Sequence, residues 1–410
     1  MNDLIDSVLY FGYYPVCARS SLPDVISRSA SAQVPTLDRD ELVTNVQHAF
    51  GEAIDAELAL TDCETTHVVP LSAGLDSRAI LGGLLDHPAV DLSDIHTISF
   101  GSPGTWDLEI GRQVAEVAGV SNTAIDLSVG SFDWSLGSIR EYAASRKTPG
   151  RVLDGYVNSQ IPTLVEDDAV IWSGFMGDPS VGGHQPDQPS KDWGAACEYF
   201  ADHERYCGGL VSSQFDPVSV LPDEPYITRK KLSYEEQLDF ALRQQCLIAP
   251  IVLHSNHYRT PFLRPCWLDV ALNLPRQHRK NRNLFKEAFL NAFPELFSLP
   301  TDAHFGLPLT ANRARGWIRS KRLGLAREIA AQMGIPYLHP ATNYIDFAAA
   351  FRTDCELRDS MYLLVSKFCN RTIDTEIDPL RIWREHQDGR DHSNEIRAIS
   401  SLELYLDARA

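Results

Sequence analysis

The amino-acid sequence predicts an α/β protein, with a parallel sheet flanked by helices followed by a mainly helical C-terminal region. Between about residues 41 and 190, short apolar runs typical of buried strands alternate with segments of helical apolar spacing. This alternation indicates a parallel sheet with helices on both faces. From about residue 190 the strand signals fade. We therefore expect a lead-in segment at 1–40, an α/β domain at 41–190 and a helical region at 191–410.

The individual elements follow from periodicity in chain order. A helix is predicted to begin near Asp38 to Asp40 and to continue to Ala59, because its apolar residues recur at helical spacing. Strands are predicted at 66–72, 94–101, 121–128 and 169–178, and helices at 76–87 and 105–119. The last strand leads into a glycine-bearing loop. Further helices are predicted at 232–257, 267–275, 282–293, 313–334 and 344–369.

Composition limits the classes of function. The 410 residues, of which 44% are hydrophobic, suffice for one large domain or two. A net charge of -18 argues against a nucleic-acid-binding surface. The eight cysteines form no CxxC pair, so we expect reduced thiols and no zinc site. The first residues, MNDLIDSV, do not resemble a signal peptide, and no apolar run reaches membrane-spanning length. A cytoplasmic protein without a membrane partner is expected.

The stretch VVPLSAGLDSRAILGGLL, Val68 to Leu85, joins a predicted strand to a predicted helix through a loop of small residues. Such a loop lets the backbone approach a phosphate, and the helix N-terminus adds N–H groups and partial positive charge. The hydroxyls of Ser72 and Ser77 can donate to phosphate oxygens. Asp76 would be repelled by a phosphate but can bind a bridging Mg²⁺. The alternative is that Asp76 merely caps the helix.

Several segments, in order, resemble the synthetase domain of asparagine synthetase-like enzymes of the ATP pyrophosphatase (PP-loop) superfamily. SAGLDS resembles their SGGxDS pyrophosphate loop, and His96 to Gly119 resembles the following strand, loop and helix. Ile171 to Gly183 resembles their SGxGxDExxGG segment, and His257 to Pro265 their ExRxPFLD segment. VLYFGYYP resembles the entry into that domain. The resemblance covers most of residues 8–310 and implies an adenine nucleotide alpha hydrolase-like fold.

The resemblance implies ATP and Mg²⁺ as cofactors and assigns roles to matching residues. The pyrophosphate and its Mg²⁺ would be held by Ser72, Gly74, Asp76 and Ser77, with Asp178 as the second Mg²⁺ ligand. The adenosine would be lined by Leu71, Phe100, Ser173 and Gly174. The catalytic residues would be His257, Arg259 and Lys286. Phe100 could instead be a core aromatic residue, and Asp178 a turn residue. Ala73 replaces a glycine, which is tolerable if its φ is negative.

The sequence departs from the family pattern at the acceptor end. Phe175 stands where the family has an acidic or tyrosine base, and a phenyl ring cannot take a proton. His257 replaces the glutamate of ExRxPFLD and can act as a base near neutral pH. Asp302 replaces a lysine that, in the family, stabilises negative charge on the phosphates in the transition state. His304 follows two residues later. Possible substitutes are Lys280, Arg282 and Lys286, which could equally form a solvated basic face. Arg264 replaces the final aspartate.

These features favour an ATP-dependent amide-forming ligase that adenylates a carboxylate for attack by ammonia or an amine. Residue 2 is Asn, and only about forty residues precede the synthetase-like region, so glutamine hydrolysis by the family route is not expected. Nitrogen would come from ammonia, an amine or a separate glutaminase subunit. The carboxylate could be aspartate, giving asparagine biosynthesis, or another acid. The alternatives are a non-catalytic nucleotide-binding homologue and a different PP-loop enzyme, such as a tRNA thiolase or lysidine synthetase.

Overall fold

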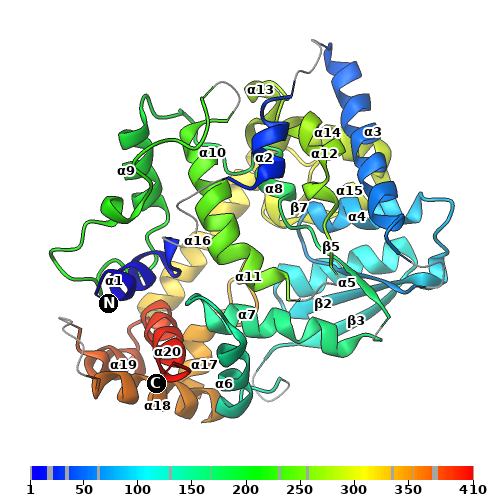
Figure 1. The fold of residues 1–410 in the computed structure, drawn as a ribbon. Helices are drawn as coiled ribbons and strands as arrows, with labels where there is room; N and C mark the ends of the chain where they lie inside the picture. Colours follow the sequence, from blue (N-terminus) through cyan, green and yellow to red (C-terminus); the bar gives the residue numbers. More distant parts are fainter. Residues whose placement is uncertain are drawn as a thin grey trace.

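A parallel sheet forms the centre of the α/β region in the computed structural model, which describes residues 2–15, 22–32, 37–61, 65–128, 132–166, 168–229, 232–254, 258–333, 337–353, 355–371 and 377–409 (Figure 1). Its strands are β1 (His67–Pro70), β2 (Ile95–Gly101), β3 (Ser121–Asp126), β4 (Val170–Trp172) and β5 (Tyr258–Arg259). Within these residues the order is β3-β2-β1-β4-β5, and each neighbouring pair is parallel. The α/β class expected from the sequence is confirmed.

The two faces of the sheet follow from side-chain alternation along its strands. In β1, Val69 packs into the larger hydrophobic core, whereas Val68 packs into a small cluster on the opposite face with Ile98 and Ile171. Helices α4 (Asp76–Leu85) and α5 (Trp106–Ala118) contact the sheet, and α3 (Arg39–Leu58) packs against α4. On the side of the small cluster lie α7 (Val152–Ser159) and the 3₁₀ turn η3 (Ile161–Leu164).

Local sequence signals fix the helix ends in this region. Asp38 and Glu41 form a reciprocal capping box at the start of α3, as expected from the predicted start near residue 38. Gly119 adopts a left-handed conformation, with φ of 71°, directly after α5. The helices and strands predicted between residues 38 and 128 are therefore confirmed, with boundaries that differ by a few residues.

The remaining helices are mostly in the second half of the chain. The α-helices are α1 (Asn2–Phe11), α2 (Asp24–Ser29), α6 (Leu136–Ser145), α8 (Gly177–Ser180), α9 (Trp193–His203), α10 (Tyr234–Leu238), α11 (Ala249–Val252), α12 (Pro265–Ala271), α13 (Arg276–Arg279), α14 (Asn283–Ala292), α15 (Pro294–Phe297), α16 (Arg313–Met333), α17 (Phe347–Thr353), α18 (Cys355–Cys369), α19 (Pro379–Gln387) and α20 (Ser393–Asp407). The 3₁₀ turns are η2 (Leu92–Asp94), η4 (Pro217–Val220), η6 (Pro261–Leu263), η7 (Lys280–Arg282) and η8 (Asp302–His304). Strands β6 (Pro300–Thr301) and β7 (Leu307–Pro308) form a separate antiparallel pair.

One predicted helix differs in detail from the structure, and one strand was not predicted. The helix predicted at 232–257 is divided into α10, the π-helix η5 (Asp239–Ile248) and α11. β5 was not predicted, because two residues cannot show strand alternation; it pairs with β4 from the segment expected to be helical or loop. The segment 169–178 was expected to be a strand that ends in a glycine-bearing loop, and this is confirmed: the strand is Val170–Trp172, and the loop leads into the short helix α8.

The described residues among the first forty, 2–15, 22–32 and 37–40, belong to the packed structure. Phe11 and Tyr13 are fully buried in the larger core, and α1 contacts α20 at the other end of the chain, beside it in Figure 1. The larger core contains residues from Tyr10 to Phe297 and so includes both sides of the domain boundary predicted at residue 190. That boundary stays a prediction. Among the described helices, none combines the length and apolar character that crossing a bilayer requires.

Candidate functional site

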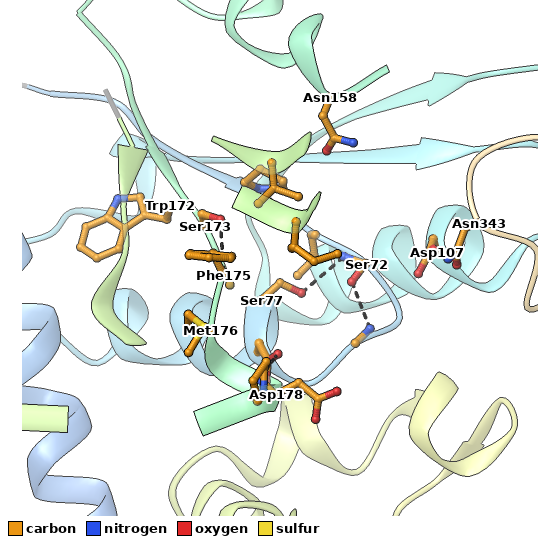
Figure 2. Close-up of a pocket in the computed structure, with 18 of the residues that line it drawn as sticks. Ser72, Ser77, Asp107, Asn158, Trp172, Ser173, Phe175, Met176, Asp178 and Asn343 are labelled. Carbon is orange, nitrogen blue, oxygen red and sulfur yellow. Dashed lines mark hydrogen bonds between the residues drawn. The ribbon is translucent and has the colours of Figure 1, made fainter. Parts of the chain in front are cut away.

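A cavity of about 430 Å³ opens where the strand order reverses, at the carboxyl ends of β1 and β4 (Figure 2). Parallel α/β sheets bind ligands at this switch point, and the volume is in the range of small-molecule sites. The structure brings nine residues expected at a site into the lining of this cavity: Leu71, Ser72, Gly74, Asp76, Ser77, Phe100, Ser173, Gly174 and Asp178. They come from β2, from the loops that follow β1 and β4, and from the first turns of α4 and α8.

The loop after β1 is held in a defined shape by its neighbours. The Ala73 N–H donates to Asp107 Oδ1 over 3.2 Å, and the Gly74 N–H donates to Ser72 Oγ over 3.1 Å. Ala73 is not among the residues with positive φ, and it does not line the cavity, so its extra methyl causes no backbone strain. Helix α4 begins directly after the loop, with no side-chain cap at Leu75. Its first N–H groups can therefore bind an anion.

Asp76 and Asp178 form a close carboxylate pair below this loop. Asp76 Oδ2 accepts the backbone N–H of Asp178 over 2.9 Å, while the buried Oδ1 of Asp76 has no hydrogen-bond partner among the described residues. Gly177 permits this approach, because a Cβ there would lie 2.5 Å from Asp76 Cγ. Burial and the charge of Asp178 raise the pKa of Asp76 to about 7.

A divalent cation fits the chemistry of this pair. The unpartnered oxygen of Asp76 is a free ligand atom, and positive charge would relieve the repulsion that raises its pKa. No group of three or more acidic, histidine or cysteine ligands occurs within the described part of the chain. A site with only two carboxylates suits Mg²⁺, which commonly binds one or two carboxylates and completes its shell with water and substrate phosphates.

Asp178 also faces two cationic groups that the sequence alone did not bring to it. Arg282 Nε lies 3.1 Å from Asp178 Oδ1, and His184 Nε2 lies 3.6 Å from Oδ2. Burial opposes ionisation of Asp178, but His184 and Arg282 outweigh it and lower its pKa. Burial likewise disfavours a charged His184, but Asp178 and Asp239, 3.0 Å away, raise its pKa to about 10. His184 and Asp239 were missed because they are 55 residues apart and share no motif.

The three predicted substitutes for the missing lysine separate in space. Asn281 and Arg282 both have left-handed φ, at 56° and 59°, and this turn directs Arg282 toward Asp178. Lys286 is half-buried, and burial together with Arg282 lowers its pKa to about 8. Lys280 instead pairs with the exposed Asp187 over 2.8 Å. The three basic residues therefore do not form one basic face. Arg282 and Lys286 lie near the carboxylate pair, whereas Lys280 forms an ion pair at the protein surface.

Two expected acceptor-end residues lie outside the cavity lining. Arg259 Nη2 donates to the carbonyl of Leu60 over 2.9 Å, so its predicted catalytic role has no support from its position. Arg264 forms a two-pronged ion pair with Glu57, with both distances 2.8 Å, which is a structural contact. His257 lies outside the described residues.

Asn343 and Tyr344, from the C-terminal half of the chain, complete the cavity wall beside Phe100 and Asp107. The rings of Phe100 and Tyr344 stack with centroids 5.8 Å apart, and Asn158 Nδ2 donates to the Tyr344 hydroxyl over 2.9 Å. Figure 2 shows Asn343 beside Asp107 at the end of the cavity opposite Trp172. Asn158, Asn343 and Tyr344 were missed because they lie in unrelated segments that only the fold brings together, whereas Phe100 was expected at the site.

Phe175 is buried and lines the cavity. At this position asparagine synthetase-like enzymes have a base, whereas the phenyl ring of Phe175 cannot accept a proton. Its neighbour Met176, where the SGxGxD pattern has its second glycine, has φ of 68°. A non-glycine residue in this conformation stores about 1 kcal/mol of strain. The loop therefore keeps the glycine-type backbone shape without the glycine.

The fold and site define an α/β protein with a small-molecule cavity at the switch point of a parallel sheet. A search of protein-family models and of curated proteins finds no match to the chain.

We expect Asp107→Asn to stabilise the protein. Burial raises the pKa of Asp107 to about 6, despite the N–H of Ala73, so the carboxylate destabilises the fold once ionised. The contribution of protonated Asp107 to the free energy of unfolding is lost as the pH rises from about 4 through 6. The stability advantage of Asp107→Asn over the unaltered protein is therefore complete above that window. The gain in free energy of unfolding should be about 1–2 kcal/mol. A rise in pKa from 3.8 to about 6 corresponds to roughly 3 kcal/mol, and this value is reduced because Asp107 is partly exposed to solvent.

Urea unfolding at pH 4, 6 and 8 measures this effect. Asp133→Asn is the matched control: Asp133 also accepts a backbone N–H, from Ser135, but it is exposed, and its hydrogen bonds lower its pKa. Its replacement should slightly destabilise the protein above pH 4. If the difference in midpoint between Asp107→Asn and the unaltered protein did not grow between pH 4 and 8, the prediction would be contradicted.

Proposed function

We propose that the protein is an ATP-dependent amide-forming ligase with an adenine nucleotide alpha hydrolase-like fold, resembling asparagine synthetase-like enzymes. The observation that carries the proposal is the close pair of Asp76 and Asp178 directly beside the uncapped N-terminus of α4. This arrangement offers ligands for a metal and donors for a phosphate chain in one place. The nucleotide would extend from there toward Phe100, Ser173 and Gly174, which line the same cavity.

The proposed reaction has two steps. A carboxylate oxygen attacks the α-phosphorus of ATP, giving an acyl-adenylate and pyrophosphate. The nitrogen of ammonia or an amine then attacks the acyl carbon, AMP leaves with the electron pair of the C–O bond, and the nitrogen loses a proton. Mg²⁺ would be held by Asp76 and Asp178, and when bound it neutralises phosphate charge and favours departure of pyrophosphate.

The residues around the pair would supply the remaining electrostatics. The first N–H groups of α4 and the hydroxyls of Ser72 and Ser77 would hold the pyrophosphate portion. Asp302 stands where the family has a lysine, and Arg282 and Lys286 would supply the positive charge of that lysine. Both lie within electrostatic reach of Asp178. Fixed cations of this kind stabilise the charge that develops on the leaving group.

A second candidate is a non-catalytic nucleotide-binding homologue. Phe175 and Asp302 favour it, because both line the cavity where the family has a base and a lysine. The alternative of a tRNA-modifying PP-loop enzyme has less support, since the net charge is -18. A separate glutaminase subunit stays a possible nitrogen source.

The test is pyrophosphate release from ATP and Mg²⁺ by the full-length protein, with a panel of carboxylates led by aspartate and with ammonium or organic amines. We expect carboxylate-dependent release of pyrophosphate and one AMP per amide. Release with aspartate and formation of asparagine would identify the acid. ATP binding without pyrophosphate release for any acid would reject the ligase and favour the binding protein.

A further inference from the structure

A second cavity, of about 350 Å³, adjoins the proposed nucleotide cavity. Three residues line both cavities: Asp107, Asp302 and Asn343. Two of them are tied to the loop after β1, because Asp107 accepts the N–H of Ala73 and the N–H of Asp302 donates to the Ala73 carbonyl over 3.3 Å. The second cavity therefore meets the first at the predicted pyrophosphate loop, next to the reacting end of a bound nucleotide.

Three aromatic side chains contribute to the walls of the second cavity. Trp106 is buried at the start of α5, and Phe305, 42% exposed, follows η8. The ring of His339 lies edge-on to that of Trp106, with centroids 6.3 Å apart. Burial and the charge of Arg327 lower the pKa of His339, so this ring is neutral at neutral pH. Leu323 of α16 adds an apolar surface.

The junction between the cavities carries two carboxylates, from Asp107 and Asp302. Asp302 Oδ1 accepts from Thr301 Oγ1 and from the N–H of Ala303, which keeps the side chain in place. Two cations lie within electrostatic reach of Asp302: Lys286, toward the Asp178 side, and the buried Arg78, whose donors are directed at backbone carbonyls. A ligand carboxylate at the junction would face like charges, whereas an ammonium group would face two carboxylates and aromatic rings, both of which favour cations.

We propose that the second cavity binds the amine nucleophile of the reaction, as an organic primary ammonium with an apolar or aromatic body. The proposal rests on the proposed ligase function and names its nitrogen donor. The cavity is far larger than the roughly 15 Å³ that one water-sized molecule such as ammonia needs. In the reaction, the bound ammonium first loses a proton to Asp107 or to water and becomes the free amine. Its nitrogen then forms the C–N bond to the acyl carbon, AMP departs with the electron pair of the C–O bond, and the nitrogen loses a second proton to water.

The assignment also accounts for a departure from the family pattern. A lysine at position 302 would place an ammonium where the nucleophile's ammonium must lie, and the two charges would repel. Asp302 removes that repulsion and replaces it with attraction, while Arg282 and Lys286 keep positive charge near Asp178. The substitution thus exchanges a phosphate-binding cation for an amine-binding anion.

Calorimetric titration of the full-length protein with phenethylamine tests the proposal, with 2-phenylethanol as the neutral analogue of matched shape. We expect phenethylamine to bind at least tenfold more tightly than the alcohol. Asp302→Asn should weaken amine binding at least tenfold, and Ser320→Phe should weaken it by filling the cavity without changing charge. Asp91→Asn, on an exposed turn, is the control and should change nothing. Melting temperatures confirm that each variant is folded.

The tripeptide Phe-Gly-Gly and its N-acetyl form distinguish a peptide N-terminus from a small free amine as the source of the ammonium. Binding of the free tripeptide alone assigns a peptide amine, and binding of phenethylamine alone assigns a small amine. Equal binding of phenethylamine and 2-phenylethanol, or unchanged amine binding in Asp302→Asn, overturns the proposal. Absent pyrophosphate release rejects the ligase itself. Absent ammonium selectivity in a protein that does release pyrophosphate rejects only the assignment of this cavity.

Discussion

Asp76→Asn is expected to reduce pyrophosphate release about 10³-fold and at the same time to stabilise the protein without ligands. The activity falls because an amide is a poor Mg²⁺ ligand and the charge on the leaving pyrophosphate is then no longer balanced. The asparagine oxygen can still accept the N–H of Asp178, so the local hydrogen bond survives. The comparison requires single-turnover pyrophosphate release and thermal unfolding of the same preparations.

The stability gain has a defined pH window. Because burial and Asp178 raise the pKa of Asp76 to about 7, the protonated fold is favoured at low pH, and that contribution is lost as the pH rises through 7. The melting temperature of Asp76→Asn should therefore exceed that of the unaltered protein most clearly above pH 7. Added ATP and Mg²⁺ should reverse the order, because only the unaltered protein gains binding energy from the metal.

Asp86→Asn provides the control, since Asp86 is exposed at the other end of the same helix. We expect full activity there and at most a few tenths of a kcal/mol of stabilisation, from removing a negative charge at a helix C-terminus. If Asp76→Asn destabilised the protein without ligands, Asp76 would be a structural cap of α4. The functional interpretation of the carboxylate pair would then be wrong.

Arg78→Met should cost about 3–5 kcal/mol of unfolding free energy. The Arg78 side chain is fully buried and donates to the carbonyls of Ala73, Leu296, Leu299 and Pro300. Methionine fills the volume but removes the Arg78 donor from all four carbonyls, of which Ala73 alone keeps the donors Thr301 Oγ1 and the Asp302 N–H among the described hydrogen bonds. Burial lowers the pKa of Arg78 to about 10, so the guanidinium remains charged at neutral pH and its hydrogen bonds are charge-assisted.

Nucleotide affinity should fall with Arg78→Met as well. The carbonyl of Ala73 is fixed by Arg78, Thr301 Oγ1 and the N–H of Asp302, and this fixes the peptide plane of the loop. Urea unfolding gives the stability change, and calorimetry gives ATP affinity.

Arg78→Lys keeps one donor group and should lose about half as much stability. Arg112→Met on α5, an exposed arginine 3.9 Å from Glu109, should lose less than about 0.5 kcal/mol. Equal small losses in Arg78→Met and Arg112→Met would show that Arg78 does not hold the loop.

Much of the α/β region could be predicted because its signals are local. The strand before Leu71, the small residues after it and the helix from Asp76 are contiguous, so periodicity and loop composition suffice. Parallel pairing then places Phe100, Ser173 and Ser72 at one edge, because the carboxyl ends of parallel strands lie together. The π-helix η5 and the two-residue strand β5 could not be predicted, since neither has a periodic signal of its own.

The sequence by itself determined the class of sheet, the loop after β1 and the set of residues beside it. Only the tertiary structure decided that Arg282 reaches Asp178, and that Asp302 and Asn343 meet Asp107. The physical reason is separation along the chain. Local conformation depends on neighbouring residues, whereas contacts across more than a hundred residues depend on how whole helices and strands pack, which no short pattern encodes.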